Sequence, residues 1–303
     1  MCGIVGLHLR NPELYPRLGE LLTGMLIEMQ DRGADSAGVA VYGDPRWSPE
    51  GHASVSLIAE GHSIGEVAAA IDAVLPDRLP DSATRVVEAG STLVVSAPIE
   101  VSSLREAVAI ALPEALVIGF GEDIAVLKGV GHPRDLAAKY GLAYSQGWQG
   151  VGHTRMATES AVTPAGCHPY TVGADQCLVH NGSFSNHASI RRELRRLGVQ
   201  FDSENDTEVG ARFVAHQLAQ GRDLETALKE LCATFDGFYT LLVSTRDSFA
   251  VVRDAIACKP AVLAETDDWV AMASEYRALV DLPGIEDAHI YEPEPERIYA
   301  WTR

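Results

Sequence analysis

Residues 1–6 of the chain read MCGIVG, with a cysteine directly behind the initiator methionine. Removal of Met1 by an aminopeptidase would leave a thiol and a free α-amine on the same residue, Cys2. A thiol reacts as its thiolate and needs a base or a positive neighbour, and an α-amine that titrates near pH ~8 can take that proton. The stretch predicts either a nucleophile that carries its own base or a small residue buried at the start of a strand. On position alone the second is the commoner.

The whole chain has 303 residues, of which 47% are hydrophobic, and a formal net charge of -18. This length supports one large core, or one core with a smaller lobe. The negative charge argues against a nucleic-acid partner, because affinity for phosphates depends on clustered Lys and Arg. No apolar run approaches the roughly 20 residues of a membrane span, and the first residues lack a signal-peptide pattern. We therefore expect a cytoplasmic protein without a membrane partner.

Two further compositional features narrow the functional classes. The five cysteines are an odd number without CxxC spacing, which argues against a disulfide framework and a cysteine-built metal site. The one basic cluster, RRELRR at 191–196, lies on a helical pattern with Ile190, Leu194 and Leu197 on the other face. A solvated helix face or a docking surface explains this cluster better than a polyanion site does.

Hydrophobic periodicity indicates how the chain is organised. CGIVGLHL and GVAVYG predict strands, and the apolar residues of 16–33 recur at helical spacing until Gly33. Residues 44–128 alternate helix-like and strand-like stretches without a catalytic constellation, so they predict an inserted α/β lobe. Helices at about 206–220 and 224–233 precede strand-like segments that are spaced as in an antiparallel sheet. This order predicts an α+β fold of stacked layers.

Two segments carry polar residues suited to binding a charged ligand. RGADSAG at 32–38 is rich in Gly, Asp and Ser, although an ordinary helix end and turn has the same composition. GHTRMATES at 152–160 contains Arg155 in an otherwise small, polar segment. A guanidinium group suits a carboxylate ligand, and a surface arginine is the commoner explanation.

Two later segments offer an oxyanion site and a second charge. Asn181 and Gly182 follow an apolar strand, and an amide with a backbone N–H can stabilise an oxyanion; a plain Asn-Gly hairpin turn is the alternative. Asp206 could pair with an ammonium group, or could serve as a helix N-cap. Each signal is weak separately, but their joint occurrence behind MCGI is strong.

The ordered motifs CGIxG, RGxDSxG, GHTR, HNG and DTE resemble the glutaminase domain of the class II glutamine amidotransferases, which are N-terminal nucleophile hydrolases. The chain is still more similar to the glutaminase-like subunit of N-methylglutamate synthase and glutamate synthase-like complexes. That resemblance covers nearly all of residues 1–303. It implies a four-layer α-β-β-α sandwich, interrupted here by the lobe at 44–128.

The resemblance also implies a role for each motif residue. Cys2 is expected to attack the side-chain amide of glutamine with its own α-amine as general base. Asn181 and Gly182 would stabilise the tetrahedral oxyanion. Arg155 would bind the α-carboxylate and Asp206 the α-ammonium of the substrate. A Cys2 thioester and ammonia result, and water then releases glutamate.

The segment after the arginine departs from the family pattern. The family commonly has Trp, Ala, Thr and His there, whereas this chain has Met156, Ala157, Thr158 and Glu159. Loss of the aromatic ring and the histidine argues against efficient glutaminase activity of the chain alone. Thr158 is still expected to line the substrate pocket. His168 is a weaker site candidate, for which a structural role is an equal explanation.

The sequence supplies no chemistry for an ammonia acceptor, since it has no phosphate loop, flavin motif or Fe–S spacing. The resemblance places that chemistry, and FMN, on a flavin-containing glutamate synthase-like partner subunit, so this chain would hold no cofactor and would act in a hetero-oligomer on glutamine or glutamate. Two alternatives remain: a catalytically quiet scaffold or regulatory subunit, and a free-standing hydrolase of another amide. Arg155 and Asp206 match the two charges of a free amino acid, which favours glutamine over another amide.

Overall fold

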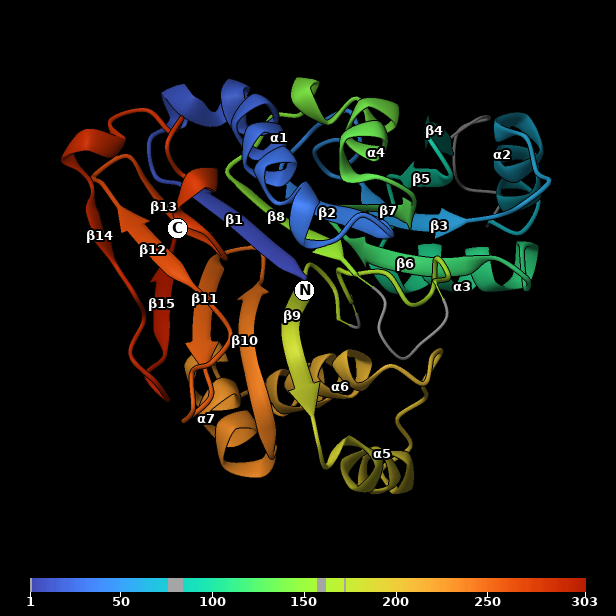
Figure 1. Cartoon of the computed structure of the whole chain (residues 1–303). Helices are drawn as coiled ribbons and strands as arrows, with labels where there is room; N and C mark the ends of the chain where they lie inside the picture. Colours follow the sequence, from blue (N-terminus) through green and yellow to red (C-terminus); the bar gives the residue numbers. More distant parts are fainter. Residues whose placement is uncertain (1, 76–83, 157–161, 172) are drawn as a thin grey trace.

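Two β-sheets face each other at the centre of the fold, and helices cover the outer side of each (Figure 1). The computed structural model describes residues 2–75, 84–156, 162–171 and 173–303. Within these ranges the first sheet has the strand order β14-β12-β13-β1-β8-β2-β7 and the second the order β15-β11-β10-β9. All their pairings are antiparallel.

Among the described residues, seven strands form the first sheet and four form the second. The first sheet consists of β1 (Gly3–Leu9), β2 (Ser36–Tyr42), β7 (Ile124–Val130), β8 (Gln149–Arg155), β12 (Val262–Glu265), β13 (Trp269–Ala273) and β14 (His289–Tyr291). The second consists of β9 (Cys177–Phe184), β10 (Gly237–Ser244), β11 (Ser248–Arg253) and β15 (Tyr299–Thr302).

Helices close the two outer faces of the sandwich. The first sheet is covered by α1 (Leu18–Glu28) and α4 (Pro133–Tyr140), and the second by α5 (His187–Arg196), α6 (Asp206–Ala219) and α7 (Leu224–Thr234). Short 3₁₀ helices are η1 (Pro12–Arg17), η2 (Gln30–Arg32), η3 (Leu142–Tyr144), η4 (Tyr276–Ala278) and η5 (Ile285–Asp287). The predicted α+β sandwich of four layers, α-β-β-α, is confirmed.

Strand β1 shows why the layers stack in this order. It is buried along its whole length, with Val5, Leu7 and Leu9 in the cluster that includes the apolar face of α1. Ile4 belongs to the cluster between the two sheets. Because successive side chains of a strand point to opposite faces, a strand that is buried on both faces must lie between two layers.

The inserted lobe has its own sheet and core. Its antiparallel strands β3 (Ala53–Ile58), β4 (Arg85–Ala89), β5 (Thr92–Ala97) and β6 (Leu116–Gly121) have the order β4-β5-β3-β6, and α2 (Ile64–Asp72) and α3 (Val101–Ala111) pack on this sheet. Residues 124–128, which the sequence pattern assigned to the lobe, lie instead in β7. Their pairing with β2 places them in the seven-stranded sheet.

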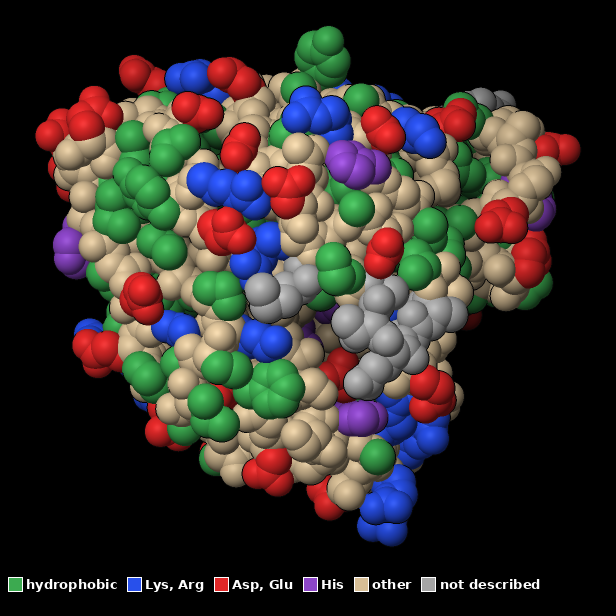
Figure 2. All heavy atoms as spheres, viewed as in Figure 1, with side chains coloured by type: hydrophobic (Ala, Val, Ile, Leu, Met, Phe, Trp, Pro, Cys, Tyr) green, Lys and Arg blue, Asp and Glu red, His purple; other side chains and the backbone are tan. Residues whose placement is uncertain are grey.

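The basic cluster on α5 is mostly a solvated helix face. Arg192, Arg195 and Arg196 are exposed, and basic side chains gather over this helix at the lower right of Figure 2. Arg191 is the exception, because its side chain is buried. Among the described residues, no helix combines the length and the apolar character that crossing a bilayer requires.

Two glycine substitutions test the close approach of the sheets. A Cβ on Gly6 would lie 2.6 Å from Leu242 Cδ2 and 2.8 Å from the Phe249 ring, whereas a Cβ on Gly24 of α1 would meet no atom within 4 Å. We expect Gly6→Ala to lower the free energy of unfolding by ~1–3 kcal/mol. Gly24→Ala should raise it by ~0.5–1 kcal/mol. Urea denaturation measures both, and equal effects of the two substitutions would contradict the tight contact at Gly6.

Candidate active site

Cys2 lies half-buried at the N-terminal end of β1, next to both sheets. Its backbone carbonyl accepts a hydrogen bond from Arg32 Nε at 2.9 Å and one from Asn181 Nδ2 at 3.2 Å. Arg32 comes from η2, behind the first sheet, and Asn181 comes from β9 of the second. The peptide group that follows the thiol is therefore fixed from two layers of the fold.

Arg32 is a site residue that the sequence patterns did not reveal. Its side chain is 8% exposed, and Nη1 forms an ion pair with Glu275 Oε1 at 2.7 Å. Glu275 directly precedes η4. The Arg32 guanidinium group is therefore held by Cys2 and Glu275, which lie at opposite ends of the sequence. The only signal in the sequence is that Arg32 opens RGADSAG. Nothing in the local pattern shows that this arginine is buried.

The RGADSAG segment does more than end a helix. A Cβ on Gly33 would lie 2.4 Å from the carbonyl carbon of Arg155, so only glycine fits at this contact. The Asp35 N–H donates to the Arg155 carbonyl at 3.1 Å, and Ser36 pairs with Arg155 between β2 and β8. The segment therefore supports the backbone of Arg155.

Arg155 is the last residue of β8 and is 5% exposed, so the surface-arginine alternative is wrong. In the antiparallel register of β1 and β8, Gly3 pairs with Thr154. One residue further, Arg155 comes level with Cys2. The arginine that could bind a carboxylate thus belongs to the strand next to the candidate nucleophile.

Asn181 and Gly182 lie inside strand β9, and the hairpin-turn alternative is wrong. They pair with Thr240 and Tyr239 of β10. Gly182 has a φ of 145°, which other residues rarely adopt, and a Cβ there would lie 2.0 Å from the Phe238 carbonyl oxygen. Asn181 is 3% exposed and reaches Cys2. Their assignment as oxyanion donors stays a prediction.

Asp206 is the first residue of α6, and the N-cap is its neighbour Asn205, whose Oδ1 accepts from the Thr207 N–H at 2.9 Å. Asp206 Oδ2 accepts from the Phe184 N–H at 2.8 Å. This bond ties the start of α6 to the end of β9. A carboxylate in the first turn is also favoured by the helix dipole. Asp206 is therefore anchored to Phe184, which lies two residues beyond Gly182 in β9.

Comparisons with known proteins show the family of the chain. Residues 153–281 match the family model described as a glutamine amidotransferase domain. Over 304 aligned residues, the chain is 47% identical to the glutamine amidotransferase-like protein GlxB of Rhizobium meliloti, with 99% of this chain and 98% of the relative covered. The chain belongs to the glutamine amidotransferase family.

Solved structures show the same fold at low identity. The allosteric regulatory enzyme of purine biosynthesis superposes with a TM-score of 0.64 at 17% identity, covering 99% of this chain and 47% of that one. The glutamine phosphoribosylpyrophosphate amidotransferase of B. subtilis, complexed with ADP and GMP, gives a TM-score of 0.60 at 17% identity, with coverages of 99% and 49%. This glutamine amidotransferase chain spans about half the length of both.

A layer of buried histidines lies beside the site in this glutamine amidotransferase. His153 Nε2 donates to the His180 carbonyl at 3.1 Å and so joins β8 to β9. His168 stacks on His153 with ring centroids 4.0 Å apart. Thr207 Oγ1 lies 3.0 Å from His168 Nε2 and 2.9 Å from His180 Nδ1. These contacts favour the structural role of His168.

Burial keeps these histidines uncharged. It lowers the pKa of His153 to about 3 and that of His180 to about 4, and it lowers the pKa of His168 well below the ordinary value. An imidazole that cannot be hydrated is costly to protonate. At neutral pH the histidine layer therefore adds hydrogen bonds but no charge to the region around Asp206.

The segment that follows Arg155 is only partly described. Thr158 and Glu159 lie outside the described residues, and Met156 is 43% exposed just after β8.

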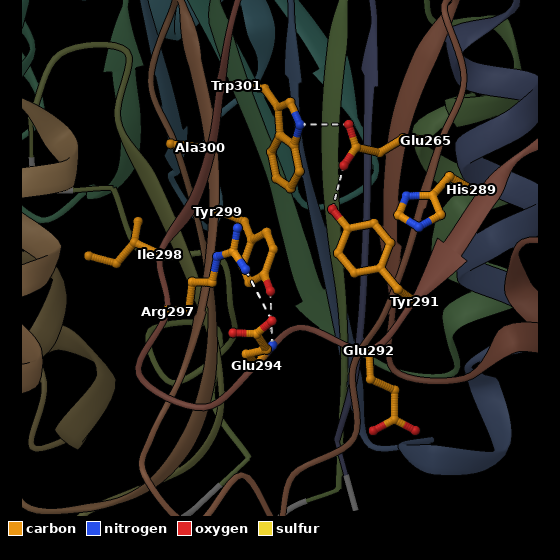
Figure 3. Close-up of a pocket in the computed structure, with 10 residues that line it drawn as sticks. All are labelled: Glu265, His289, Tyr291, Glu292, Glu294, Arg297, Ile298, Tyr299, Ala300 and Trp301. Atoms are coloured by element: carbon orange, nitrogen blue, oxygen red, sulfur yellow. Dashed lines mark hydrogen bonds and ion pairs between the residues drawn. The ribbon is translucent and has the colours of Figure 1, made fainter.

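Within 2–75, 84–156, 162–171 and 173–303, no group of three or more His, Cys, Asp or Glu side chains could hold a metal ion. A cavity of about 550 Å³ between β14 and β15 contains none of the predicted site residues (Figure 3).

The histidine layer predicts an acid-sensitive fold. Between pH 6.5 and about 4 the unfolded chain protonates His180 whereas the folded chain does not, so the free energy of unfolding falls as the pH falls. One histidine contributes a slope of ~1.4 kcal/mol per pH unit in this window. His180→Gln should reduce the slope by about that amount. Urea denaturation at pH 6 and pH 5 measures it, and an unchanged slope would refute the assignment.

Proposed function

We propose that this chain is a glutaminase subunit, which hydrolyses the side-chain amide of free glutamine through a Cys2 thioester. One observation carries the proposal: Asn181 reaches Cys2 at the N-terminal end of β1, and the strand that ends at Arg155 pairs with β1. Asn181 donates to the carbonyl of Cys2, and the register of β8 brings Arg155 level with it. The proposed nucleophile just before β1 and the carboxylate-binding group at the end of β8 thus belong to one sheet, and the amide donor comes from β9 of the facing sheet.

The proposed reaction proceeds in two stages. After removal of Met1, the α-amine of Cys2 takes the thiol proton, and the thiolate attacks the amide carbon of glutamine. Donors on Asn181 and Gly182 stabilise the oxyanion. The α-amine passes its proton to the leaving nitrogen, so that ammonia departs and a thioester remains. Water then attacks the thioester, releases glutamate and restores the thiol.

Two charged side chains give the proposed site its selectivity for glutamine. Arg155 binds the α-carboxylate and Asp206 the α-ammonium, and together they fix the amide carbon over the thiol. Such positioning can lower a barrier by several kcal/mol. Thr158 completes the pocket in this proposal. Burial of Arg155 and the anchoring of Asp206 by the Phe184 N–H support these assignments.

The proposed acceptor of the ammonia lies on another chain. We infer a hetero-oligomer in which a flavin-containing, glutamate synthase-like protein binds FMN and consumes the ammonia, as in N-methylglutamate synthase. The resemblance of the sequence supports this partner. The exposed side of the lobe, which has a core of its own, is the proposed contact surface.

A mass measurement tests the nucleophile. We expect the purified protein to lack Met1 and to gain one adduct with a diazo-ketone glutamine analogue, and Cys2→Ala to gain none. Retained Met1 and no adduct, with or without the flavoprotein partner, would replace this proposal by the scaffold alternative. An adduct that free glutamine does not prevent would favour a hydrolase of another amide.

A second variant tests the oxyanion donor. Asn181→Ala should lower kcat for glutamine by ~10²–10³-fold and change KM little, because the donor acts mainly in the transition state. Asn186→Ala removes an amide that donates to the Thr234 carbonyl instead and should affect only stability. Coupled measurement of glutamate release compares the two. A fall in kcat of less than tenfold for Asn181→Ala would remove Asn181 from the proposed mechanism.

A further inference from the structure

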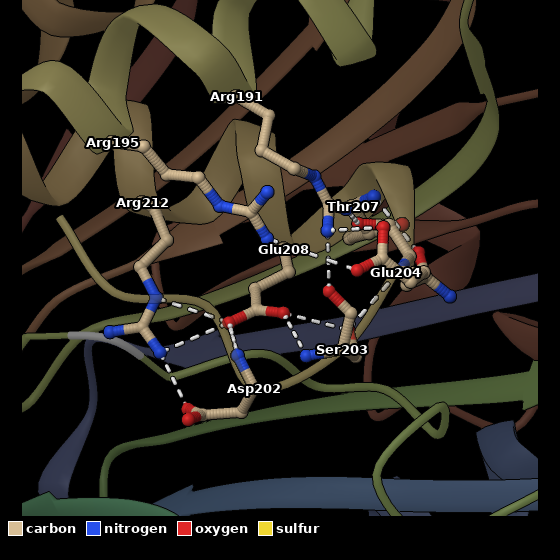
Figure 4. Close-up of polar contacts among 9 residues, drawn as sticks. Arg191, Arg195, Asp202, Ser203, Glu204, Thr207, Glu208 and Arg212 are labelled. Atoms are coloured by element: carbon tan, nitrogen blue, oxygen red, sulfur yellow. Dashed lines mark hydrogen bonds and ion pairs between the residues drawn. The ribbon is translucent and has the colours of Figure 1, made fainter.

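The segment at 202–205, which leads directly into Asp206, has an irregular backbone held by two buried ionised side chains (Figure 4). One is Glu208 of α6, which is 2% exposed, and the other is Arg191 of α5, which is 4% exposed. They come from the two helices that the segment connects. Both point back to its main chain.

Glu208 accepts hydrogen bonds from the backbone N–H groups and one hydroxyl of residues 202–203. Its carboxylate accepts from the Asp202 N–H at 2.8 Å, and from the N–H and the hydroxyl of Ser203 at 2.7 Å each. A helix residue in this turn often caps the first free N–H groups of its own helix. Glu208 reaches further, to residues before the N-cap, and so fixes where the chain enters α6.

Arg191 donates hydrogen bonds to two backbone carbonyls and one carboxylate of residues 203–205. Nη1 donates to the Ser203 carbonyl at 2.7 Å and to Glu204 Oε2 at 2.9 Å, and Nη2 donates to the Asn205 carbonyl at 3.0 Å. The planar fork of a guanidinium group fixes direction as well as distance. Glu208 and Arg191 therefore hold opposite sides of the chain just before Asp206.

Burying these charged side chains costs more desolvation free energy than a simple connection between two helices requires. Glu208 is balanced by Arg212, whose Nη2 lies 3.0 Å from its carboxylate, and taking such charges out of water has a penalty that their attraction only partly offsets. Contacts among Ile190, Leu194 and Val209 in the apolar cluster already pack α5 and α6 together. The buried charges therefore contribute mainly to the conformation of 202–205.

Asp206 is the residue whose position depends on that conformation. Its Oδ2 is held by the Phe184 N–H, and its Oδ1 has a long, 3.4 Å hydrogen bond from Thr207 Oγ1. We propose that Glu208 and Arg191 are positioning residues for the substrate, which place Asp206 to meet the α-ammonium of an amino acid. This inference rests on the proposed function. Selectivity for α-amino acids thus depends on buried charges that do not touch the ligand.

Binding of L-glutamate, measured by calorimetry, tests the inference without requiring turnover. Glu208→Gln keeps the shape of the side chain but offers an amide to the two N–H groups, so we expect Kd to rise at least tenfold. Glu225→Gln is the matched control. Glu225 also lies in the first turn of its helix and pairs with a basic residue four positions on, Lys229, but its side chain is 53% exposed. Its substitution should change Kd less than twofold.

A double-mutant cycle separates positioning from general stability. In an Asp206→Asn background, Glu208→Gln should change Kd less than twofold, because the contact that it positions is already lost. Arg191→Lys keeps the charge without the fork and should behave as Glu208→Gln does. This second variant decides the question if Glu208→Gln unfolds. Thermal unfolding of every variant shows which of them remain folded.

The outcomes distinguish this inference from the proposed function. Unchanged binding by Glu208→Gln and Arg191→Lys, or an equal loss in both backgrounds, would overturn the positioning role. If the wild-type chain binds glutamate but Cys2 forms no adduct, the glutaminase proposal fails and the cycle still decides the role of Glu208. If the wild-type chain binds neither glutamine nor glutamate, both proposals are wrong.

Discussion

The carbonyl oxygen of Cys2 is the point at which three layers of this fold meet. Arg32 reaches it from behind the first sheet and Asn181 from the second, while Cys2 itself precedes the central strand. Each donor depends on a separate part of the fold: Arg32 on the ion pair with Glu275, and Asn181 on the register of β9 with β10. A shift in either layer would move the peptide beside the thiol.

Charge near the site is controlled by burial. The chain has a formal net charge of -18. Of the two charged residues proposed to bind substrate, Arg155 ends β8 of the first sheet and Asp206 begins α6, which covers the second. His153, His168 and His180 are kept neutral because burial lowers their pKa values. Buried Lys128 donates to two backbone carbonyls, and burial lowers its pKa to about 8. At neutral pH the histidines therefore add no charge near the zwitterionic ligand, whereas Lys128 stays mostly protonated and is held by backbone carbonyls.

Local patterns of the sequence predicted the layers but not the contacts between distant segments. The helical spacing within 16–33 matches the buried face of α1. Of the motif residues, Asn181 reaches Cys2, and Arg155 ends the strand that pairs with β1. The Asn-Gly pair could not be assigned to a strand or a turn, because only pairing with β10 fixes its conformation. The local pattern also does not predict burial of Arg32, which pairs with the distant Glu275, or of Arg191, which belongs to a run of otherwise exposed arginines and is bound by the chain before α6. For the same reason the sequence pattern places residues 124–128 in the lobe, whereas their pairing with β2 places them in the seven-stranded sheet.

The pairing of β2 with β7 also determines how the lobe joins the framework. Tyr42 and Ile124 are cross-strand partners, and the Gly43 N–H donates to the Asp123 carbonyl at 2.9 Å. In topological terms, residues 43–123 are the loop of a single β-hairpin. The entropy of closing a loop grows only slowly with its length, so a hairpin can carry a long or a short loop at similar cost. The length of this segment can therefore change at little entropic cost to the hairpin, while Ile58 and Ile118 join it to the core that also contains Ile124.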